Sequence, residues 1–173
     1  MQATEQRGRT VRDRASCRLT PERLFDLLAD PMERQKWDLC PPYIVQEPVA
    51  AAPGPALEGA RYTVRGTARG IGFVGKTVIT AAERPRRYET RSETRFERAY
   101  PEAVAIEEYL IEPEGTGSLV HYTMTIVKTP GTGAFLMAAL SALLEPVMVP
   151  RAAKSNFRNM LRYAEKHAAA VIA

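Results

Sequence analysis

Polar and apolar residues alternate along much of the chain between Val11 and Lys128. From Val11 to Leu19 every second position faces the same way, and arginines occupy most of the positions between. A period of two is typical of a half-buried strand. Thr20-Pro21 then marks the start of a helix, and Asp30-Pro31 ends it and begins a second one. The pattern predicts a strand at 11–19 followed by two short helices at 21–29 and 32–37.

The same alternation returns in the middle of the chain, where turns rich in glycine and proline separate the segments. It predicts six further strands, at about 43–49, 61–69, 71–81, 87–97, 103–112 and 119–128. From Phe135 onward the pattern is helical. Residues 135–145 are strongly apolar, and beyond Pro150 basic and apolar residues recur at helical spacing. Pro146 and Pro150 are expected to prevent a single straight helix through this point.

This order of elements predicts an α+β fold. Consecutive antiparallel strands twist and curl into a curved sheet, here of about seven strands. We expect one long amphipathic C-terminal helix to cover the concave face of this sheet. The two short helices follow the first strand. The chain reads as one domain over residues 9–170, preceded by a flexible polar tail of residues 1–8.

The most regular strand, Arg87 to Glu97, carries an informative inner face. Its outer face alternates arginine and glutamate, which is typical of a solvated sheet surface. Its other face consists of Tyr88, Thr90, Ser92, Thr94 and Phe96. Buried hydroxyls need hydrogen-bond partners, so three in a row indicate a cavity holding water or a partly polar ligand. The alternative is that they only satisfy strand propensity at the end of a sheet.

Other residues are expected to face the same interior. The ordinary interpretation of inward-facing aromatic residues is that they pack in the core. The alternative is that they line a cavity. Asn156 lies one helical turn from Met160 and therefore faces the sheet. The candidate ligand-binding residues from this pattern are Tyr62, Tyr88, Thr90, Ser92, Thr94, Phe96, Tyr122, Asn156, Phe157 and Met160.

Residues with the chemistry of catalysis or metal binding are few. Glu107 and Glu108 are adjacent on a predicted strand, so one of them points inward or the strand end is wet. The wet strand end is the ordinary interpretation, and an inward Glu107 is a weak candidate acid or base. His121 and His167 have no carboxylate or thiol at a useful spacing. The sequence therefore predicts no metal site and no cofactor.

Composition and charge narrow the class of protein. The 173 residues carry a net charge of +4, and residues 128–173 hold six basic and two acidic side chains. No stretch is long and apolar enough to span a membrane and no secretory signal is visible. Cys17 and Cys40 fit neither a metal site nor a disulfide framework, so a cytoplasmic protein with free thiols is expected. The charge is too small to indicate nucleic-acid binding.

The basic excess lies on the predicted C-terminal helix. Its stripe is a candidate for transient contact with an anionic membrane surface. The apolar segment 134–145 beside it is open to three interpretations, namely a lid over the cavity, a dimer contact or a membrane-touching segment. Monomer and homodimer both remain open. The stripe consists of Arg151, Lys154, Arg158 and Arg162, and Lys166 continues it.

Several motifs resemble the START-like (SRPBCC) superfamily, which includes polyketide cyclases/dehydrases, lipid-transport proteins and uncharacterised bacterial proteins. They are the strand-to-helix entry from Leu19 to Pro31, Trp37, the turn Glu83-Arg84-Pro85-Arg86 before Tyr88, and the hairpin turn 113–118 with the strand after it. The resemblance covers about residues 9–168. It implies a helix-grip fold whose deep cavity takes hydrophobic ligands, and it adds Trp37 to the candidate ligand-binding residues.

The polyketide aromatase/cyclases of this superfamily carry a pattern that resembles Trp-x-Ser-x-Arg on the strand before the Glu-Arg-Pro turn. The matching positions here are Gly75, Thr77 and Ile79. Thr77 stands in for the serine and becomes a second weak catalytic and ligand-binding candidate, while the tryptophan and arginine are absent. We therefore expect a binding protein, carrier or sensor, for a small hydrophobic ligand such as a lipid or polyketide. The alternative is a cyclase/dehydrase-like enzyme using the same cavity, and a third hypothesis is a partner-binding module using the basic stripe.

Overall fold

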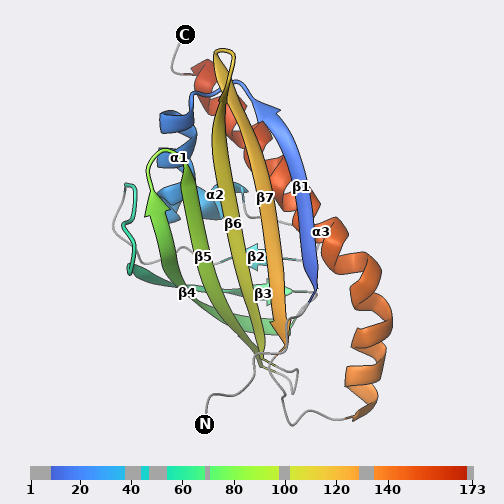
Figure 1. Cartoon of the computed structure of the whole chain (residues 1–173). Helices are drawn as coiled ribbons and strands as arrows, with labels where there is room; N and C mark the ends of the chain where they lie inside the picture. Colours follow the sequence, from blue (N-terminus) through green and yellow to red (C-terminus); the bar gives the residue numbers. More distant parts are fainter. Residues whose placement is uncertain are drawn as a thin grey trace, which may run out of the picture.

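A computed structural model describes residues 9–37, 44–46, 54–68, 71–97, 102–128 and 135–170, and the predicted tail, residues 1–8, lies outside these ranges. It contains one seven-stranded antiparallel sheet in the order β1-β7-β6-β5-β4-β3-β2. The sheet curls strongly, so that β2 and β3 cross behind β5, β6 and β7 (Figure 1). The strands are β1 (Thr10–Cys17), β2 (Ile44–Gln46), β3 (Arg61–Ala68), β4 (Ile71–Glu83), β5 (Arg87–Phe96), β6 (Ala103–Glu114) and β7 (Gly117–Lys128).

Three helices lie on one side of this sheet (Figure 1). The short helices α1 (Pro21–Ala29) and α2 (Pro31–Trp37) follow β1, and the long helix α3 (Phe135–Ala170) ends the fold. The predicted α+β, helix-grip architecture is therefore confirmed, including the order of its elements. No helix within the described ranges combines the length and the apolar character needed to span a membrane.

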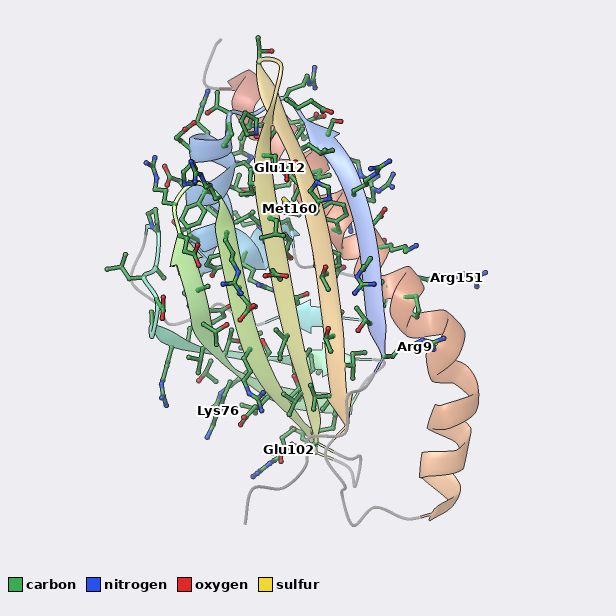
Figure 2. All side chains as sticks on the ribbon, in the orientation of Figure 1. Arg9, Lys76, Glu102, Glu112, Arg151 and Met160 are labelled. Atoms are coloured by element: carbon green, nitrogen blue, oxygen red, sulfur yellow. The ribbon has the colours of Figure 1, made fainter. Side chains whose placement is uncertain are left out.

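Helix α3 differs from the prediction at its prolines. It continues as one helix through Pro146 and Pro150. Proline removes one hydrogen bond and crowds the preceding turn, and in a helix held by tertiary contacts this bends the helix rather than ending it. The helix changes direction close to Arg151 (Figures 1 and 2). The side chains of residues 135–149, which include most of the apolar segment, lie outside the described part of the chain.

Aromatic residues fill the core between helix α1 and the part of the sheet that it packs against, which is the upper part of the molecule in Figure 1. Phe25 of α1 packs edge-on against Tyr88 of β5, with ring centroids 6.0 Å apart. Tyr122 of β7 stacks on Phe157 of α3 at 5.1 Å, with the ring planes 6° apart. Tyr109 lies between Tyr88 and Tyr122 in the same row of the sheet. The three tyrosine side chains of this row are at most 2% exposed and belong to the packed core.

The β6–β7 hairpin fastens the first strand to the sheet. Gly115 adopts a φ of +58° in its turn, a conformation that favours glycine. Ser118 is fully buried, and its hydroxyl donates a 2.7 Å hydrogen bond to the Leu19 carbonyl oxygen. Gly117 faces the backbone of Cys17 so closely that a Cβ at this position would overlap the Cys17 carbonyl oxygen. The end of β1 therefore packs directly on the backbone of β7.

Candidate functional site

A cavity of about 300 Å³ lies over the lower part of the inner face of the sheet. Strand register explains its position, because one row of paired residues runs Tyr62, Thr77, Ser92, Ala105 and Ile126 across five strands. The next row runs Val64, Gly75, Thr94 and Ala103. Small residues dominate these rows and leave space where the aromatic row above is filled. The wall consists of these nine residues with Arg34, Phe73, Phe96, Glu107, Met124 and Asn156.

The two ends of the cavity differ in chemistry. At the lower end Phe73 and Phe96 face each other with ring centroids 6.0 Å apart. At the upper end Arg34 from α2 pairs with Glu107 from β6, and Asn156 from α3 is a further polar residue of the wall. Helices α2 and α3 therefore supply polar groups to a wall that the sheet makes mostly apolar. An apolar cavity with a few convergent polar groups is the usual form of a small-molecule site.

Arg34 and Glu107 form an ion pair in the upper end of the cavity. Nη2 of Arg34 donates to Oε2 of Glu107, and the two side chains are only 10% and 14% exposed. The Tyr122 hydroxyl donates a 3.0 Å hydrogen bond to Oε1 of the same carboxylate. The guanidinium also lies over the ring of Trp37, 5.3 Å from its centroid, which is a favourable cation–π arrangement. Glu107 is thus bound on both oxygens.

Burial and the neighbouring carboxylate both act on Tyr122. Burial away from water disfavours the phenolate and raises the pKa of Tyr122 well above its usual value, and the negative charge and hydrogen bond of Glu107 raise it further. The phenol is therefore protonated at neutral pH and can donate the 3.0 Å hydrogen bond to Glu107. Through this hydrogen bond Tyr122 holds the Glu107 carboxylate in its inward orientation.

The interpretation of Glu107 as a wet strand end is wrong. Glu107 faces inward, because β6 places Ala105, Glu107 and Tyr109 on the same face. Glu108 faces outward and accepts a 2.8 Å hydrogen bond from Nε of Arg87. The partner that stabilises the inward carboxylate is Arg34, a residue that the sequence analysis did not identify.

The predicted hydroxyl face divides between cavity and core. Ser92 and Thr94 lie in the cavity wall, and Ser92 shares a 2.8 Å hydrogen bond with Thr77. Thr90 is fully buried one row higher, beside Glu107. Within the described residues its Oγ1 has no hydrogen-bond partner.

The structure divides the other candidate ligand-binding residues in the same way. Tyr62, Thr77, Phe96 and Asn156 lie in the cavity wall. A second group lies in the packed core above it: Trp37, Tyr88, Tyr122, Phe157 and Met160. Met160 points from α3 toward the sheet (Figure 2). The wall residues that sequence reasoning missed are Arg34, Val64, Phe73, Ala103, Ala105, Met124 and Ile126.

The positions that match the aromatase/cyclase pattern also divide. Gly75 and Thr77 line the cavity, whereas Ile79 is fully buried in the core. All three share one face of β4, but Ile79 pairs with the buried Thr90 in the row above the cavity, and the register of β4 with β5 shifts only beyond it, between Ile79 and Ala81. Two of the three positions therefore belong to the cavity wall and the third to the packed core.

The histidines lie away from the cavity. Nε2 of His121 is 3.5 Å from a carboxylate oxygen of Glu112 on the outer face of the β6–β7 hairpin. The Tyr163 hydroxyl donates its single proton to Glu33 of α2, so it accepts the 3.0 Å hydrogen bond that joins it to Nε2 of His167. Burial alone would raise the pKa of Glu33, but the hydrogen bonds from Lys36 and Tyr163 outweigh it and the pKa is lowered. Among the described residues no group of three or more His, Cys, Asp or Glu could hold a metal ion.

The curved sheet, the terminal helix and the cavity between them together define a helix-grip fold. The sequence model of the family described as polyketide cyclase / dehydrase and lipid transport matches residues 9–168. The chain belongs to this family and to the START-like (SRPBCC) superfamily. A comparison with proteins of curated function finds no match.

Solved structures share the fold at low sequence identity. Protein CV1439 from Chromobacterium violaceum is 17% identical with a TM-score of 0.63, over 91% of this chain and 94% of that one. TTHA0849 from Thermus thermophilus is 20% identical with a TM-score of 0.59, over 90% and 97%. A protein from Arthrobacter aurescens is 12% identical with a TM-score of 0.64, over 91% and 86%. At these identities the likeness shows the fold alone.

Proposed function

We propose that the protein is a carrier or sensor that binds a small, mostly hydrophobic ligand, such as a lipid or a polyketide, in the cavity. The observation that carries the proposal is the composition of the wall, with aromatic rings at one end and polar groups of Arg34, Glu107 and Asn156 at the other. Apolar burial would supply the affinity, and the polar end would orient the ligand. The family is compatible with this function. A cytoplasmic location is part of the proposal, and Cys17, a buried free thiol, fits a reducing compartment.

Gly75 offers a way to fill the cavity without disturbing the fold. Among the described residues, a Cβ at this position would meet only Thr94 Oγ1 at 3.6 Å and the Val64 carbonyl oxygen at 4.0 Å within a 4 Å radius. Gly75→Leu is therefore expected to place its side chain in the cavity, where it occupies space that a ligand would need. It should weaken binding of the uncharged probe 2-naphthamide at least tenfold by calorimetry, a loss of about 1.4 kcal/mol or more.

The matched control is Lys76→Leu, which adds the same side chain one residue away on the outer face of β4 (Figure 2). It should bind the probe like the wild type. Equal affinity of Gly75→Leu and wild type would contradict binding in this cavity. Native mass spectrometry of the freshly purified protein, followed by solvent extraction, would identify any ligand that copurifies.

The second candidate function is a cyclase/dehydrase-like enzyme using the same cavity. It is supported by the presence of both weak catalytic candidates, Thr77 and Glu107, in the cavity wall. Glu107→Gln or Thr77→Val would then abolish turnover of a polyketide substrate while ligand binding persists. Loss of affinity in step with loss of turnover would argue for a carrier instead.

We propose in addition that one basic face touches anionic membrane surfaces. β1 and α3 lie side by side, joined by ion pairs from Arg158 to Asp13 and from Arg18 to Glu165. Residues 9–18 and 150–167 hold nine basic and two acidic side chains, a balance of +7, which leaves −3 for the rest of a chain whose total is +4. The basic residues, all exposed, are Arg9, Arg12, Arg14, Arg18, Arg151, Lys154, Arg158, Arg162 and Lys166.

Sedimentation with lipid vesicles tests this contact. We expect binding to vesicles containing phosphatidylglycerol at low salt, and release at high salt because salt screens exposed charges. Arg151→Glu/Lys154→Glu should abolish it. Arg61→Glu/Lys76→Glu, the same charge change on the other side of the molecule, should leave it intact. Equal binding to vesicles of phosphatidylcholine alone would exclude an electrostatic contact.

A further inference from the structure

The charges in the cavity wall cancel each other. Among its fifteen described lining residues, Arg34 and Glu107 are the only Asp, Glu, Lys or Arg side chains, and they bind each other directly. Tyr122 donates to the second oxygen of the carboxylate, and the ring of Trp37 covers the guanidinium. The site therefore offers a ligand an ion pair with no net charge, in which both carboxylate oxygens of Glu107 already accept hydrogen bonds.

A charged ligand group would meet an unfavourable environment at this end of the cavity. A carboxylate or phosphate would have to displace Glu107 from Arg34, or lie beside Glu107 with little water to screen the repulsion. An ammonium group would meet the same conflict with Arg34. In both cases the ligand also loses its own hydration, which is costly for an ion without a dedicated partner.

An uncharged polar group meets no such conflict. Hydroxyl, carbonyl and amide groups can exchange hydrogen bonds with the Asn156 amide and with the hydroxyls of Thr77, Ser92 and Thr94, which act as both donors and acceptors. The volume of about 300 Å³ lies at the lower limit for small-molecule sites, which favours a compact ligand. The Phe73–Phe96 pair at the opposite end suits its apolar or aromatic part.

We infer that the Arg34–Glu107 ion pair makes the cavity selective for compact, uncharged ligands bearing hydroxyl, carbonyl or amide groups, and excludes carboxylates, phosphates and ammonium ions. The inference rests on the proposed binding function and specifies the chemical class of its ligand. It also predicts that the selectivity is set by the pair, so that neutralising either partner changes which charge the cavity accepts.

Three probes of nearly equal shape test this selectivity: 2-naphthamide, 2-naphthoate and 2-naphthylmethylammonium. At neutral pH the wild type should bind the amide at least tenfold more tightly than either ion by calorimetry. Glu107→Gln leaves Arg34 uncompensated and should bind the carboxylate at least tenfold more tightly than the wild type does. Arg34→Gln leaves Glu107 uncompensated and should show the corresponding gain for the ammonium probe.

The outcomes separate the inference from the function on which it rests. Wild-type binding of naphthoate or the ammonium probe as tight as that of the amide overturns the selectivity, as does a folded Glu107→Gln that gains nothing for naphthoate. If circular dichroism shows that either variant is unfolded, the affinities of the wild type for the three probes decide the question alone. If no probe binds the wild type, or Gly75→Leu binds all three unchanged, the cavity is not the binding site and the proposed function itself fails.

Discussion

Replacing Glu107 by leucine is expected to lower the free energy of unfolding by about 3 kcal/mol, the usual cost of leaving one partner of a buried pair uncompensated. Arg34 would keep its charge in an environment where its side chain is only 10% exposed, and the Tyr122 hydroxyl would lose its acceptor. Arg34→Met/Glu107→Leu removes both charges and leaves side chains of similar size. We expect the double variant to regain most of the lost free energy of unfolding, because two charged side chains no longer lose their hydration when the protein folds.

Urea denaturation of the wild type, both single variants and the double variant forms the cycle that measures the coupling. The exposed pair Arg18–Glu165 is the matched control, since Arg18 is 79% exposed, and its cycle should give at most about 1 kcal/mol. A cost below about 1 kcal/mol for Glu107→Leu would mean that water in the cavity screens the pair. A double variant as unstable as the single one would mean that packing, and not charge, is lost.

Gly117→Ala is expected to destabilise the protein by about 3 kcal/mol or more, because its methyl group would overlap the Cys17 carbonyl oxygen and lie 3.2 Å from the Arg18 Cα. Neither is the end of a flexible side chain. The end of β1 would have to move away from β7, which would strain the buried hydrogen bond from Ser118 to Leu19. For a domain of this size, this loss corresponds to a fall in Tm of roughly 6–12 °C.

Gly72→Ala is the matched control for this prediction. The three atoms nearest to its methyl group would be those of the Glu97 carboxylate, which the methyl group would overlap, and Glu97 is an exposed side chain that can swing away. The loss of backbone freedom in the unfolded chain favours alanine there, so the net change should stay within about 1 kcal/mol. A Gly117→Ala melting temperature within about 2 °C of the wild type would show that the hairpin can shift away from β1.

Local patterns in the sequence determined the elements and the faces of this protein. Alternation from Arg87 to Phe96 predicts a strand with an inner hydroxyl face, because successive side chains on a strand point to opposite sides. Thr20-Pro21 predicts the start of α1 because proline suits the first helical position. These signals depend on near neighbours, and with the motifs of the START-like superfamily they were enough to predict the helix-grip fold.

Only the tertiary structure decided where the cavity lies and what charge it holds. Thr90, Ser92 and Thr94 share one face, yet register places Ser92 beside small residues in the wall and Thr90 in the packed core. Arg34 resembles any other polar residue of a short helix, and its contact with Glu107 joins positions 73 residues apart. Such contacts depend on strand register, sheet curvature and helix placement, which alternation does not encode. The sequence pattern is therefore enough to predict the fold, whereas the cavity wall and its ion pair arise only when the folded chain brings distant residues together.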